Sequence, residues 1–252
     1  MTRTRAALTH LAVSVTLAVA AAFLILSGWF TLPYFWLIGG PLLLALIVGV
    51  DVILGPLMTF IVCAPGKSRK ELFFDLSLIG LLQAAALVYG LHASYTSRLV
   101  YAVYVDGAFH LVKSNELGIA GVGESKRPEF FSLPLFGPHF IGAQLPTTAK
   151  GVSDLSFYRT TGVGDFRVPE YYVPLVEVRQ QMVGHGLSRE ALAKRNPALL
   201  KNVDALLSKS RLKWTQVGVF PLDVLQRGTY TVVVNMDEAT VLKVLAQSPN
   251  TD

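Results

Sequence analysis

The sequence predicts a membrane protein with three N-terminal transmembrane helices followed by an extracytoplasmic α+β domain. The chain has 252 residues, of which 52% are hydrophobic, and its longest apolar runs lie in roughly the first ninety positions. A run of about 20 apolar residues can cross the hydrocarbon core of a bilayer as a helix. Three runs reach that length: Leu11–Phe30, Phe35–Val62 and Leu72–His92. We therefore predict a transmembrane domain over residues 1–97 and a second domain over residues 98–252.

The first two apolar runs each carry a feature that a plain span lacks. Arg3 and Arg5, followed by the small residues "AVAAA", are typical of a signal peptide, but the apolar sequence continues past these alanines, which favours an uncleaved span. The second run is longer than one crossing requires and contains Pro41 and Pro56. We expect a tilt or a kink within it.

The basic residues beside the runs predict the orientation. Arg3 and Arg5 precede the first run, and Lys67, Arg69 and Lys70 lie between the second and the third, whereas the short connection "TLPY" has no positive charge. Lysine and arginine collect on the cytoplasmic side of membrane proteins. The sequence therefore predicts a multi-pass membrane protein with a cytoplasmic N-terminus and a C-terminal domain on the opposite side of the membrane.

The C-terminal domain is close to neutral. Residues 98–252 hold 17 Lys or Arg against 14 Asp or Glu, a formal net charge of +3. This balance argues against a nucleic-acid partner. Cys63 is the single cysteine, so no disulfide can form within the chain, although the domain would face an oxidising compartment.

Local patterns predict the first strands of this domain. "LVYAVYVDGAFHLVK" is typical of a hairpin, because two runs of β-branched and aromatic residues meet at Asp106–Gly107, a pair that tolerates positive φ angles. Both faces of the hairpin are apolar, which predicts that it is buried inside a sheet. Between Ser114 and Thr148, glycines and prolines recur too often for long regular elements, so we expect short strands and loops there.

Two helices and a strand pair are predicted further along. One helix should follow Pro174 and end near Gly184 or Gly186. Asn196 and Pro197 are typical of the cap and the first position of a second helix, and five residues form its apolar face: Leu199, Leu200, Val203, Leu206 and Leu207. The tail "YTVVVNMDEATVLKVLAQ" predicts a strand, a turn and a last short strand or helix.

No motif of a catalytic or metal site stands out. Gly118–Lys126 has the glycine spacing of a phosphate-binding loop, but Glu124 occupies the lysine position, which favours a flexible loop. No serine lies in a GxSxG turn, and one cysteine cannot build a thiolate site. Two acidic pairs are interpreted as surface charge: Asp154 with Asp165, and Glu170 with Glu177. The histidines lack zinc spacing and are each expected at a surface or an interface: His10, His92, His110, His139 and His185. We expect a protein that is not an enzyme and that needs no metal or cofactor.

The polar residues inside the apolar runs are more informative. An ionised carboxylate at the centre of a spanning helix costs about 2.5–3.5 kcal/mol on insertion scales, so it usually faces protein or water. Asp51 is such a residue, and Gly55, one turn later on the same face, would let another helix come close. In the third run one face combines polar and small residues: Asp75, Ile79, Gln83, Ala86 and Gly90. These two faces either hold the three helices together or receive a foreign helix.

These segments resemble the type IV pilin accessory proteins, the TfpX/TfpZ-like pilin chaperones of the inner membrane. Three elements carry the resemblance: Asp51, Leu54, Gly55 and Pro56 in "DVILGPLMTFIV"; Asp75, Leu76, Leu82, Gln83, Ala86, Leu87, Tyr89 and Gly90 in the third run; and Arg98 and Val100 after it. Segments of the C-terminal domain match more loosely. The sequence departs from the family pattern at Leu99, where a proline is expected, and at Gly107–Ala108, where the hairpin tip is less polar.

The resemblance implies a helper that binds type IV major pilin subunits in the inner membrane and assists their stability and assembly into pili. A pilin waits in the membrane as a single helix with its globular head outside, so the implied intramembrane contact comprises Asp51, Gly55, Pro56, Asp75, Gln83, Tyr89 and Gly90. The hairpin Val100–Val112 could present an outer surface. Membrane lipid and inner-membrane components of pilus assembly are further implied partners.

An alternative reading is a membrane-anchored extracytoplasmic ligand-binding or sensor protein. Such a protein should have a cytoplasmic output module, and the predicted cytoplasmic loop "APGKSRKE" is too short for one.

Overall fold

The computed structural model describes residues 2–30, 33–37, 39–64, 66–117, 125–224 and 228–249. The chain divides into two compact units, Met1–Arg98 and Leu99–Asp252, here called the helical unit and the sheet unit. The sequence prediction had put this boundary between residues 97 and 98. Each unit is described by itself.

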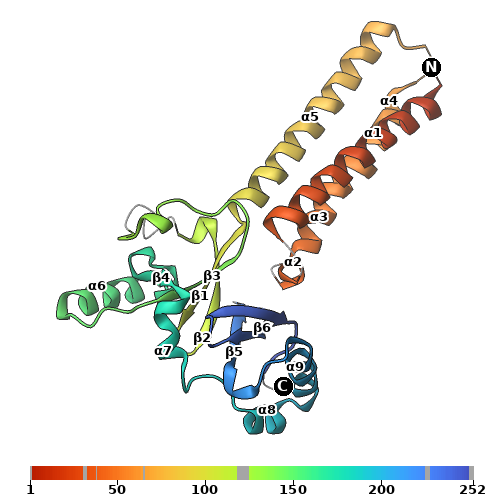
Figure 1. Ribbon diagram of the computed structural model, residues 1–252. Helices are drawn as coiled ribbons and strands as arrows, with labels where there is room; N and C mark the ends of the chain where they lie inside the picture. The colour runs from red at the N-terminus through yellow and green to blue at the C-terminus, as the bar shows by residue number, and fades with distance from the viewer. Residues whose placement is uncertain are drawn as a thin grey trace. The chain divides into compact units, whose positions relative to one another are not determined.

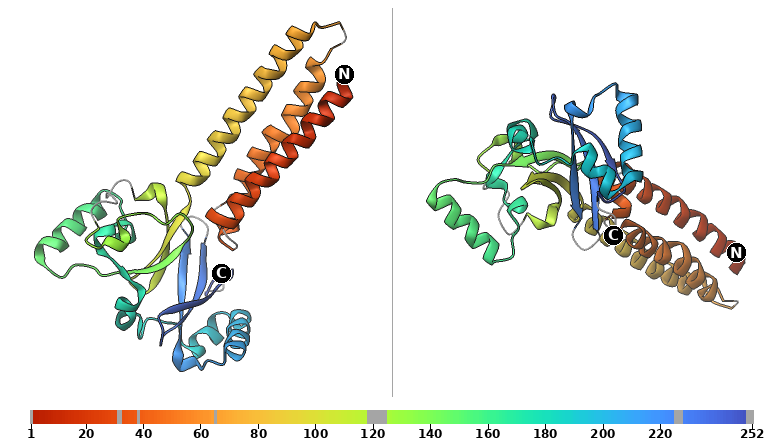
Figure 2. Two further views of the ribbon diagram at one scale, coloured as in Figure 1. Left: turned by 45° about the horizontal axis from the view of Figure 1, so that its top comes forward. Right: turned by 90° about the horizontal axis from the view of Figure 1, so that it is seen from below.

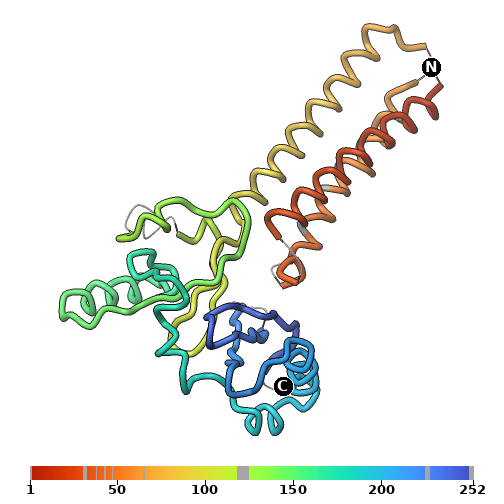
Figure 3. Tube along the Cα trace, in the orientation of Figure 1, coloured from red at the N-terminus to blue at the C-terminus, as the bar shows by residue number. Residues whose placement is uncertain are grey.

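The helical unit contains three helices that are long and apolar enough to cross a membrane: Arg3–Trp29, Gly40–Val62 and Arg69–Thr96. Their parts are α1 (Arg3–Leu24) with the π-turn η1 (Ile25–Trp29), then α3 (Gly40–Val48), the π-turn η2 (Gly49–Leu54) and α4 (Gly55–Val62), and finally α5 (Arg69–Thr96); the short α2 (Tyr34–Leu37) precedes α3. The trace in Figure 3 shows α3 and α4 following one another along one rod that lies beside α1. The predicted order of three apolar helices followed by a mixed domain is confirmed.

The sequence had suggested one span over Phe35–Val62, with a tilt or a kink. In the structure this run does not form one helix from Phe35. Gly39 has φ +83°, a left-handed conformation that separates α2 from α3. Pro41 lies in the first turn of α3 and Pro56 in the first turn of α4. Pro41 follows the break at Gly39 and therefore loses no intrahelical hydrogen bond. Pro56 follows directly on the irregular π-turn η2 and has no N–H to donate back to it.

Helix α5 is longer than the predicted run because a capping box sets its start. The backbone N–H of Glu71 donates to Ser68 Oγ at 3.3 Å, and the N–H of Ser68 donates to Glu71 Oε2 at 2.8 Å. This reciprocal pair satisfies two amides that a helix start leaves free. The helix therefore begins at Arg69, before the apolar residues do, and continues to Thr96.

The sheet unit is built on one mixed seven-stranded sheet (Figure 1) with the strand order β4-β3-β1-β2-β5-β6-β7. The strands are β1 (Leu99–Val105), β2 (Ala108–Lys113), β3 (His139–Ala143), β4 (Tyr172–Pro174), β5 (Val217–Val224), β6 (Gly228–Asn235) and β7 (Thr240–Leu245). The pairs β1–β3 and β2–β5 are parallel, and the other neighbours are antiparallel.

The predicted hairpin forms the middle of this sheet. Asp106 and Gly107 have φ angles of +49° and +86°, as a tight turn between twisted strands requires. Every residue of β1 is buried, which confirms the prediction of a buried hairpin. The short elements expected before Thr148 are also present: β3 and the 3₁₀-turns Ser114–Glu116 and Pro128–Phe130. Residues 118–124 of the predicted flexible loop lie outside the described residues.

The helices of this unit follow the sequence signals unevenly. α9 (Pro197–Ser210) is capped as predicted, because the N–H of Leu199 donates to Asn196 Oδ1 at 2.9 Å. The helix expected after Pro174 is less regular: it starts as a 3₁₀-turn and continues as the single α-turn α7 (Arg179–Met182), before Gly184 at φ +85°. The remaining helices are α6 (Ala149–Thr160) and α8 (Arg189–Arg195).

Large apolar side chains fill the core on both sides of the central hairpin. Figure 2 shows α6 near the β3–β4 end of the sheet, with α8 and α9 near the opposite end. Under α8 and α9, Leu199, Val203 and Val219 are fully buried. In the middle of the sheet, the rings of Tyr104 and Phe220 meet edge to face at 5.4 Å. Such aromatic pairs add to the free energy gained by apolar burial.

Candidate functional site: a polar cluster among the apolar helices

His10 connects the three long helices of the helical unit. It lies on α1, where its Nδ1 is 2.5 Å from Oγ1 of Thr59 on α4 and its Nε2 is 2.6 Å from Oε1 of Gln83 on α5. Thr59 is buried, whereas His10 and Gln83 are half-buried. One imidazole therefore holds a polar contact between three segments that are otherwise apolar.

The π-turn η2 explains why Gln83 is needed. The N–H of Gly55 donates to the carbonyl of Val50, five residues back. In this pattern the carbonyl of Asp51 would accept from residue 56, but Pro56 has no N–H. The side-chain Nε2 of Gln83 donates to that carbonyl instead, at 3.0 Å. A buried carbonyl that its own helix cannot satisfy is thus satisfied by a neighbouring helix.

Gly55 makes this contact possible. A Cβ atom built on Gly55 would collide with the side-chain amide of Gln83. Both Gly55 and Pro56 are buried. Small residues at a helix contact let a neighbouring segment come close in the manner typical of membrane helices, and here the space left by the glycine is filled by an amide group.

The carboxyl group of Asp51 is the incompletely satisfied member of the cluster. Asp51 is 5% exposed, and its Oδ1 atom has no hydrogen-bond partner among the described residues. A buried polar atom without a partner costs about 1–3 kcal/mol, and more when it is charged. The four residues His10, Asp51, Thr59 and Gln83, here called the polar cluster, therefore leave one strong acceptor open.

Away from the cluster the helices expose apolar side chains. Only 6% of the most apolar window of α5 is buried within the chain. Several of its large side chains are exposed: Phe73, Phe74, Leu78, Leu81, Leu82 and Val88. A helix of this kind needs lipid or another helix to cover it.

The polar cluster lies in a chain with recognisable relatives. Residues 1–39, which include His10, match the family described as Fimbrial assembly protein FimB. A fimbrial assembly protein of serogroups C1 and C2 from Dichelobacter nodosus is 36% identical over 108 residues, which cover 43% of this chain and 82% of that protein. The chain belongs to the fimbrial assembly protein family. The family assignment made from the sequence is thereby confirmed.

Two other fimbrial assembly proteins are matched over a smaller share of their own length than the protein of serogroups C1 and C2. Those of serogroups E1 and I from Dichelobacter nodosus are each 34% identical over 135 residues, which is 54% of this chain and 52% of the relative. The chain therefore spans about half the length of these two relatives. No solved structure matches it.

In this fimbrial assembly family member, four of the predicted site residues lie together: Asp51, Gly55, Pro56 and Gln83. The other three do not join them. Asp75 pairs with Lys67, whose Nζ is 2.5 Å from Asp75 Oδ2, near the connection between α4 and α5. Tyr89 is 74% exposed, and the carbonyl of the buried Gly90 accepts a hydrogen bond from Ser94 within α5. The partner-binding role of all seven residues remains a prediction.

Burial adds a detail to the predicted α5 face. Ala86 is exposed, and Leu87 is half-buried in its place. The actual inward face continues from Gln83 through Leu87 to Gly90 and Ser94, which is the i, i+4, i+7, i+11 spacing of a helix.

His10 and Thr59 were missed by the sequence reasoning. His10 had been grouped with the four other histidines and expected at a surface or an interface. It lies on a helix whose mean hydropathy reaches 2.3, and an ionisable residue inside such a helix is itself a sign of function or of polar contact. That signal was present in the sequence but was outweighed by the lack of a metal-binding pattern.

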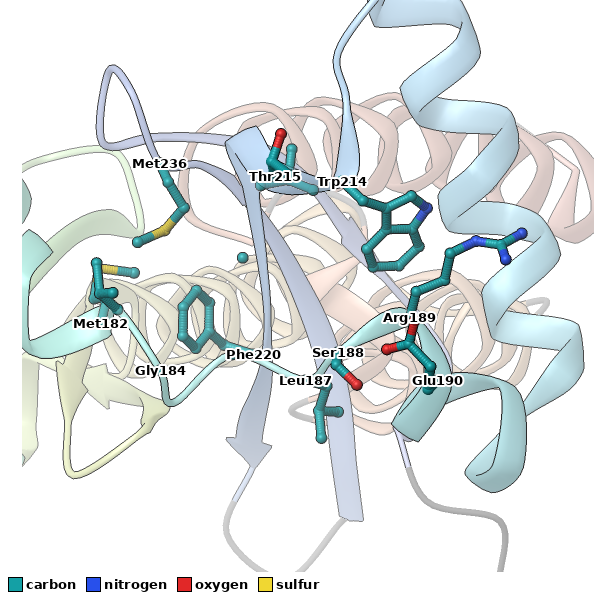
Figure 4. Close-up of a pocket in the computed structure, with 14 residues that line it drawn as sticks. Met182, Gly184, Leu187, Ser188, Arg189, Glu190, Trp214, Thr215, Phe220 and Met236 are labelled. Carbon is teal, nitrogen blue, oxygen red and sulfur yellow. The ribbon is translucent and has the colours of Figure 1, made fainter.

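The sheet unit has a groove, and the unit's buried polar atoms that lack a hydrogen-bond partner among the described residues, Arg167 Nε and Tyr171 Oη, do not line it. A hollow of about 360 Å³ lies between the segment that joins α7 to α8 and the start of β5. Figure 4 shows Met182, Phe220 and Met236 at one end of it and Trp214 with Arg189 at the other. Among the described residues, no group of three or more His, Cys, Asp or Glu could hold a metal ion.

Proposed function

We propose that this chain is a non-enzymatic accessory protein of the bacterial inner membrane that binds type IV major pilin subunits and assists their stability and assembly into pili. The names of its relatives, all fimbrial assembly proteins, support a role in assembly. The three long apolar helices support a membrane location, because each is long enough to cross a bilayer.

The arrangement of basic residues supports the orientation within this proposal. Nε of Arg3 donates to the carbonyl of Cys63 at 2.9 Å, so the start of α1 lies beside the end of α4. Lys67 and Arg69 follow in the connection to α5 and at its first residue. Arg3, Lys67 and Arg69 therefore lie at one end of the helical unit, and we assign that end to the cytoplasm. The sheet unit, which follows the other end of α5, would then be periplasmic.

The unsatisfied carboxyl of Asp51 is the observation that carries the proposal. In a polar cluster whose other side chains bond to one another, Asp51 Oδ1 has no donor among the described residues. A pilin subunit in the membrane presents a single helix, and a donor on that helix could reach this atom and remove the cost of leaving it unsatisfied. Asp51 would thereby distinguish a polar partner helix from lipid.

Access to Asp51 requires a small movement, which we assign to α5. Asp51 is 5% exposed, so a donor has to enter between helices. Since α5 buries little of its apolar surface within the chain, displacing it breaks mainly the two hydrogen bonds of Gln83 and the ring contact of Tyr95 with Trp29. The partner helix would replace the hydrogen bonds. The free chain is thus a closed state and the pilin complex an opened one.

The test is co-purification of pilin with the tagged full chain from its native cells, solubilised in detergent. Asp51→Ala should lower the amount of co-purified major pilin about tenfold, the equivalent of ~1.4 kcal/mol, at an unchanged level of the chain. Thr16→Ala is the matched control: it also removes a polar side chain from a long apolar helix, but this exposed hydroxyl donates to the carbonyl of Ala12 within α1, outside the predicted contact. It should leave the pilin yield near that of the wild type.

Two outcomes would count against the proposal at different points. Equal pilin yields from Asp51→Ala and the wild type would remove Asp51 from the contact. No pilin with the wild-type chain, together with an unchanged number of pili in a deletion strain, would defeat the pilin-binding function itself.

A further inference from the structure

The two edges of the sheet end differently. At one edge β4 has only three residues, finishes at Pro174 and is followed at once by a 3₁₀-turn. Short edge strands and prolines are the usual protection against pairing with another chain. At the other edge β7 is a strand of six residues, Thr240–Leu245, with a β-bulge at Leu242 in its pairing with β6. This edge lacks those two forms of protection.

The outer side of β7 is open. Among the described residues, β7 pairs with β6 alone, and no other backbone group of the chain bonds to it. None of its six side chains is buried, whereas Val232, Val233 and Val234 on β6 are fully buried. A strand edge with unpaired N–H and C=O groups is a template for the addition of another strand.

A basic groove runs beside this edge. A hollow of about 740 Å³ lies between α9 and β7 and is lined by Asn202, Ala205, Leu206, Lys209, Ser210, Lys243 and Leu245. Its two charged side chains are lysines, Lys209 on α9 and Lys243 on β7, and no carboxylate lines it among the described residues. Leu206 and Leu245 contribute apolar lining to it. We call this hollow the β7 groove.

We propose that β7 binds an extended segment of a partner protein as an eighth strand of the sheet, with acidic side chains of that segment lying in the β7 groove against Lys209 and Lys243. Backbone hydrogen bonds along the edge supply attraction without regard to sequence, and the side chains that alternate toward the groove supply selectivity. The two lysines favour a negatively charged partner segment. The two leucines can contact apolar side chains that lie between its acidic ones.

A second copy of this chain fits the edge less well. Antiparallel pairing of two β7 strands would bring Lys243 of both copies, and with them Lys209, to the same side of the new strand pair. Like charges on neighbouring strands are destabilising. The edge is therefore assigned to a different, acidic segment, and this assignment does not depend on which protein the helical unit binds.

The test uses the full chain in detergent and a synthetic probe. The probe is a blocked peptide of about eight residues, an ordinary strand length, that alternates valine with glutamate and carries a photoreactive group. One matched peptide has methyl groups on alternate backbone nitrogens, and another has lysine in place of glutamate. The acidic peptide should cross-link to Thr240–Leu245, and both matched peptides should bind at least about tenfold more weakly.

Variants of the chain place the effect on the groove. Lys209→Glu and Lys243→Glu should each weaken binding of the acidic peptide about three- to tenfold, because each replaces an attraction with a repulsion. Lys150→Glu, at an exposed position on α6, makes the same change of charge elsewhere and should have no effect.

Three outcomes would overturn the proposal. Equal binding of the methylated peptide would show that the backbone edge is not used. Cross-links confined to other segments would place the peptide elsewhere, and cross-links between the β7 strands of two copies would assign the edge to self-association. Each leaves pilin co-purification through Asp51 as a separate question.

Discussion

The helical unit and the sheet unit each have their own kind of internal packing. Alanines at positions 6, 18 and 21 are buried in α1, and the polar cluster provides the contacts between helices. The sheet unit buries large rings such as Tyr104, Phe109 and Phe220 in its central strands, whereas buried rings of the helical unit, among them Phe30 and Phe35, lie after α1 and outside α3, α4 and α5. Helices that meet in lipid gain little from apolar burial and depend on close approach and hydrogen bonds, whereas a domain in water depends on buried apolar area. The comparison teaches that removing a large side chain should cost most stability in the sheet unit, whereas enlarging a small one should cost most in the helical unit.

The largest effect is expected from removing a ring in the sheet unit. Phe220→Ala should lower the free energy of unfolding of this unit by about 3–5 kcal/mol, because it leaves a cavity beside Tyr104 and Phe109. This free energy is measured by denaturing the full chain chemically in detergent and monitoring the unfolding of the sheet unit by its susceptibility to proteolysis. Phe157→Ala, at a 66% exposed position on α6, should change this free energy by less than about 0.5 kcal/mol. Similar losses from both would contradict a core centred on Phe220.

In the helical unit the sharper change is an added methyl group. Gly55→Ala should cost about 1–3 kcal/mol of stability, since the new Cβ collides with the amide of Gln83 and displaces it from His10 and from the Asp51 carbonyl. Gly80→Ala in α5 is its control, because no atom lies within 4 Å of a Cβ at that position. Thermal stability of the two variants in detergent should separate them, and equal stability would show that the close approach at Gly55 is unimportant.

The smallest expected effect is a pH dependence of the sheet unit. The ring of His110 stacks on Phe166 at 4.5 Å, and burial lowers its pKa from the ordinary value of 6.5, although the nearby Asp223 carboxylate opposes this shift. Below pH 6.5 the unfolded chain protonates this histidine while the folded state resists protonation, so stability falls as the pH drops from 6.5 toward the folded-state pKa.

Unfolding measured at about pH 7.5 and about pH 5.5 tests this sign. His110→Gln should reduce the difference between the two measurements, since glutamine does not titrate. A wild-type sheet unit that gains stability on acidification would mean that attraction to Asp223 outweighs the burial of the ring.

Elements with strong local signals could be predicted from the sequence. The hairpin turn at Asp106–Gly107 requires positive φ angles, and the start of α9 follows from the cap at Asn196. Three apolar helices were predictable because their length and composition are sufficient by themselves. In these cases the residues that determine the structure are neighbours in the chain.

The parts that could not be predicted depend on contacts between distant residues. β5 contains Gly218 and Pro221, two residues that argue against a central strand. The strand forms nevertheless, because its pairing with β2 is confined to Leu222 and Asp223, beyond the proline, and β6 pairs along its whole length. In the candidate site, Asp51 and Gln83 could be singled out from the sequence because they are polar residues in apolar runs. Only the fold shows that Nε2 of His10 lies 2.6 Å from Oε1 of Gln83.

Pro56 influences which ring nitrogen of a histidine on another helix carries a hydrogen. Because this proline cannot donate to the Asp51 carbonyl, the nitrogen of the Gln83 amide must do so, and the amide oxygen is left facing His10. That oxygen can only accept, so Nε2 of His10 carries the hydrogen. In the neutral ring Nδ1 is then an acceptor, and the hydroxyl of Thr59 must point toward it. A missing N–H in α4 thus selects the tautomer of an imidazole in α1 and gives the whole chain of hydrogen bonds a single direction.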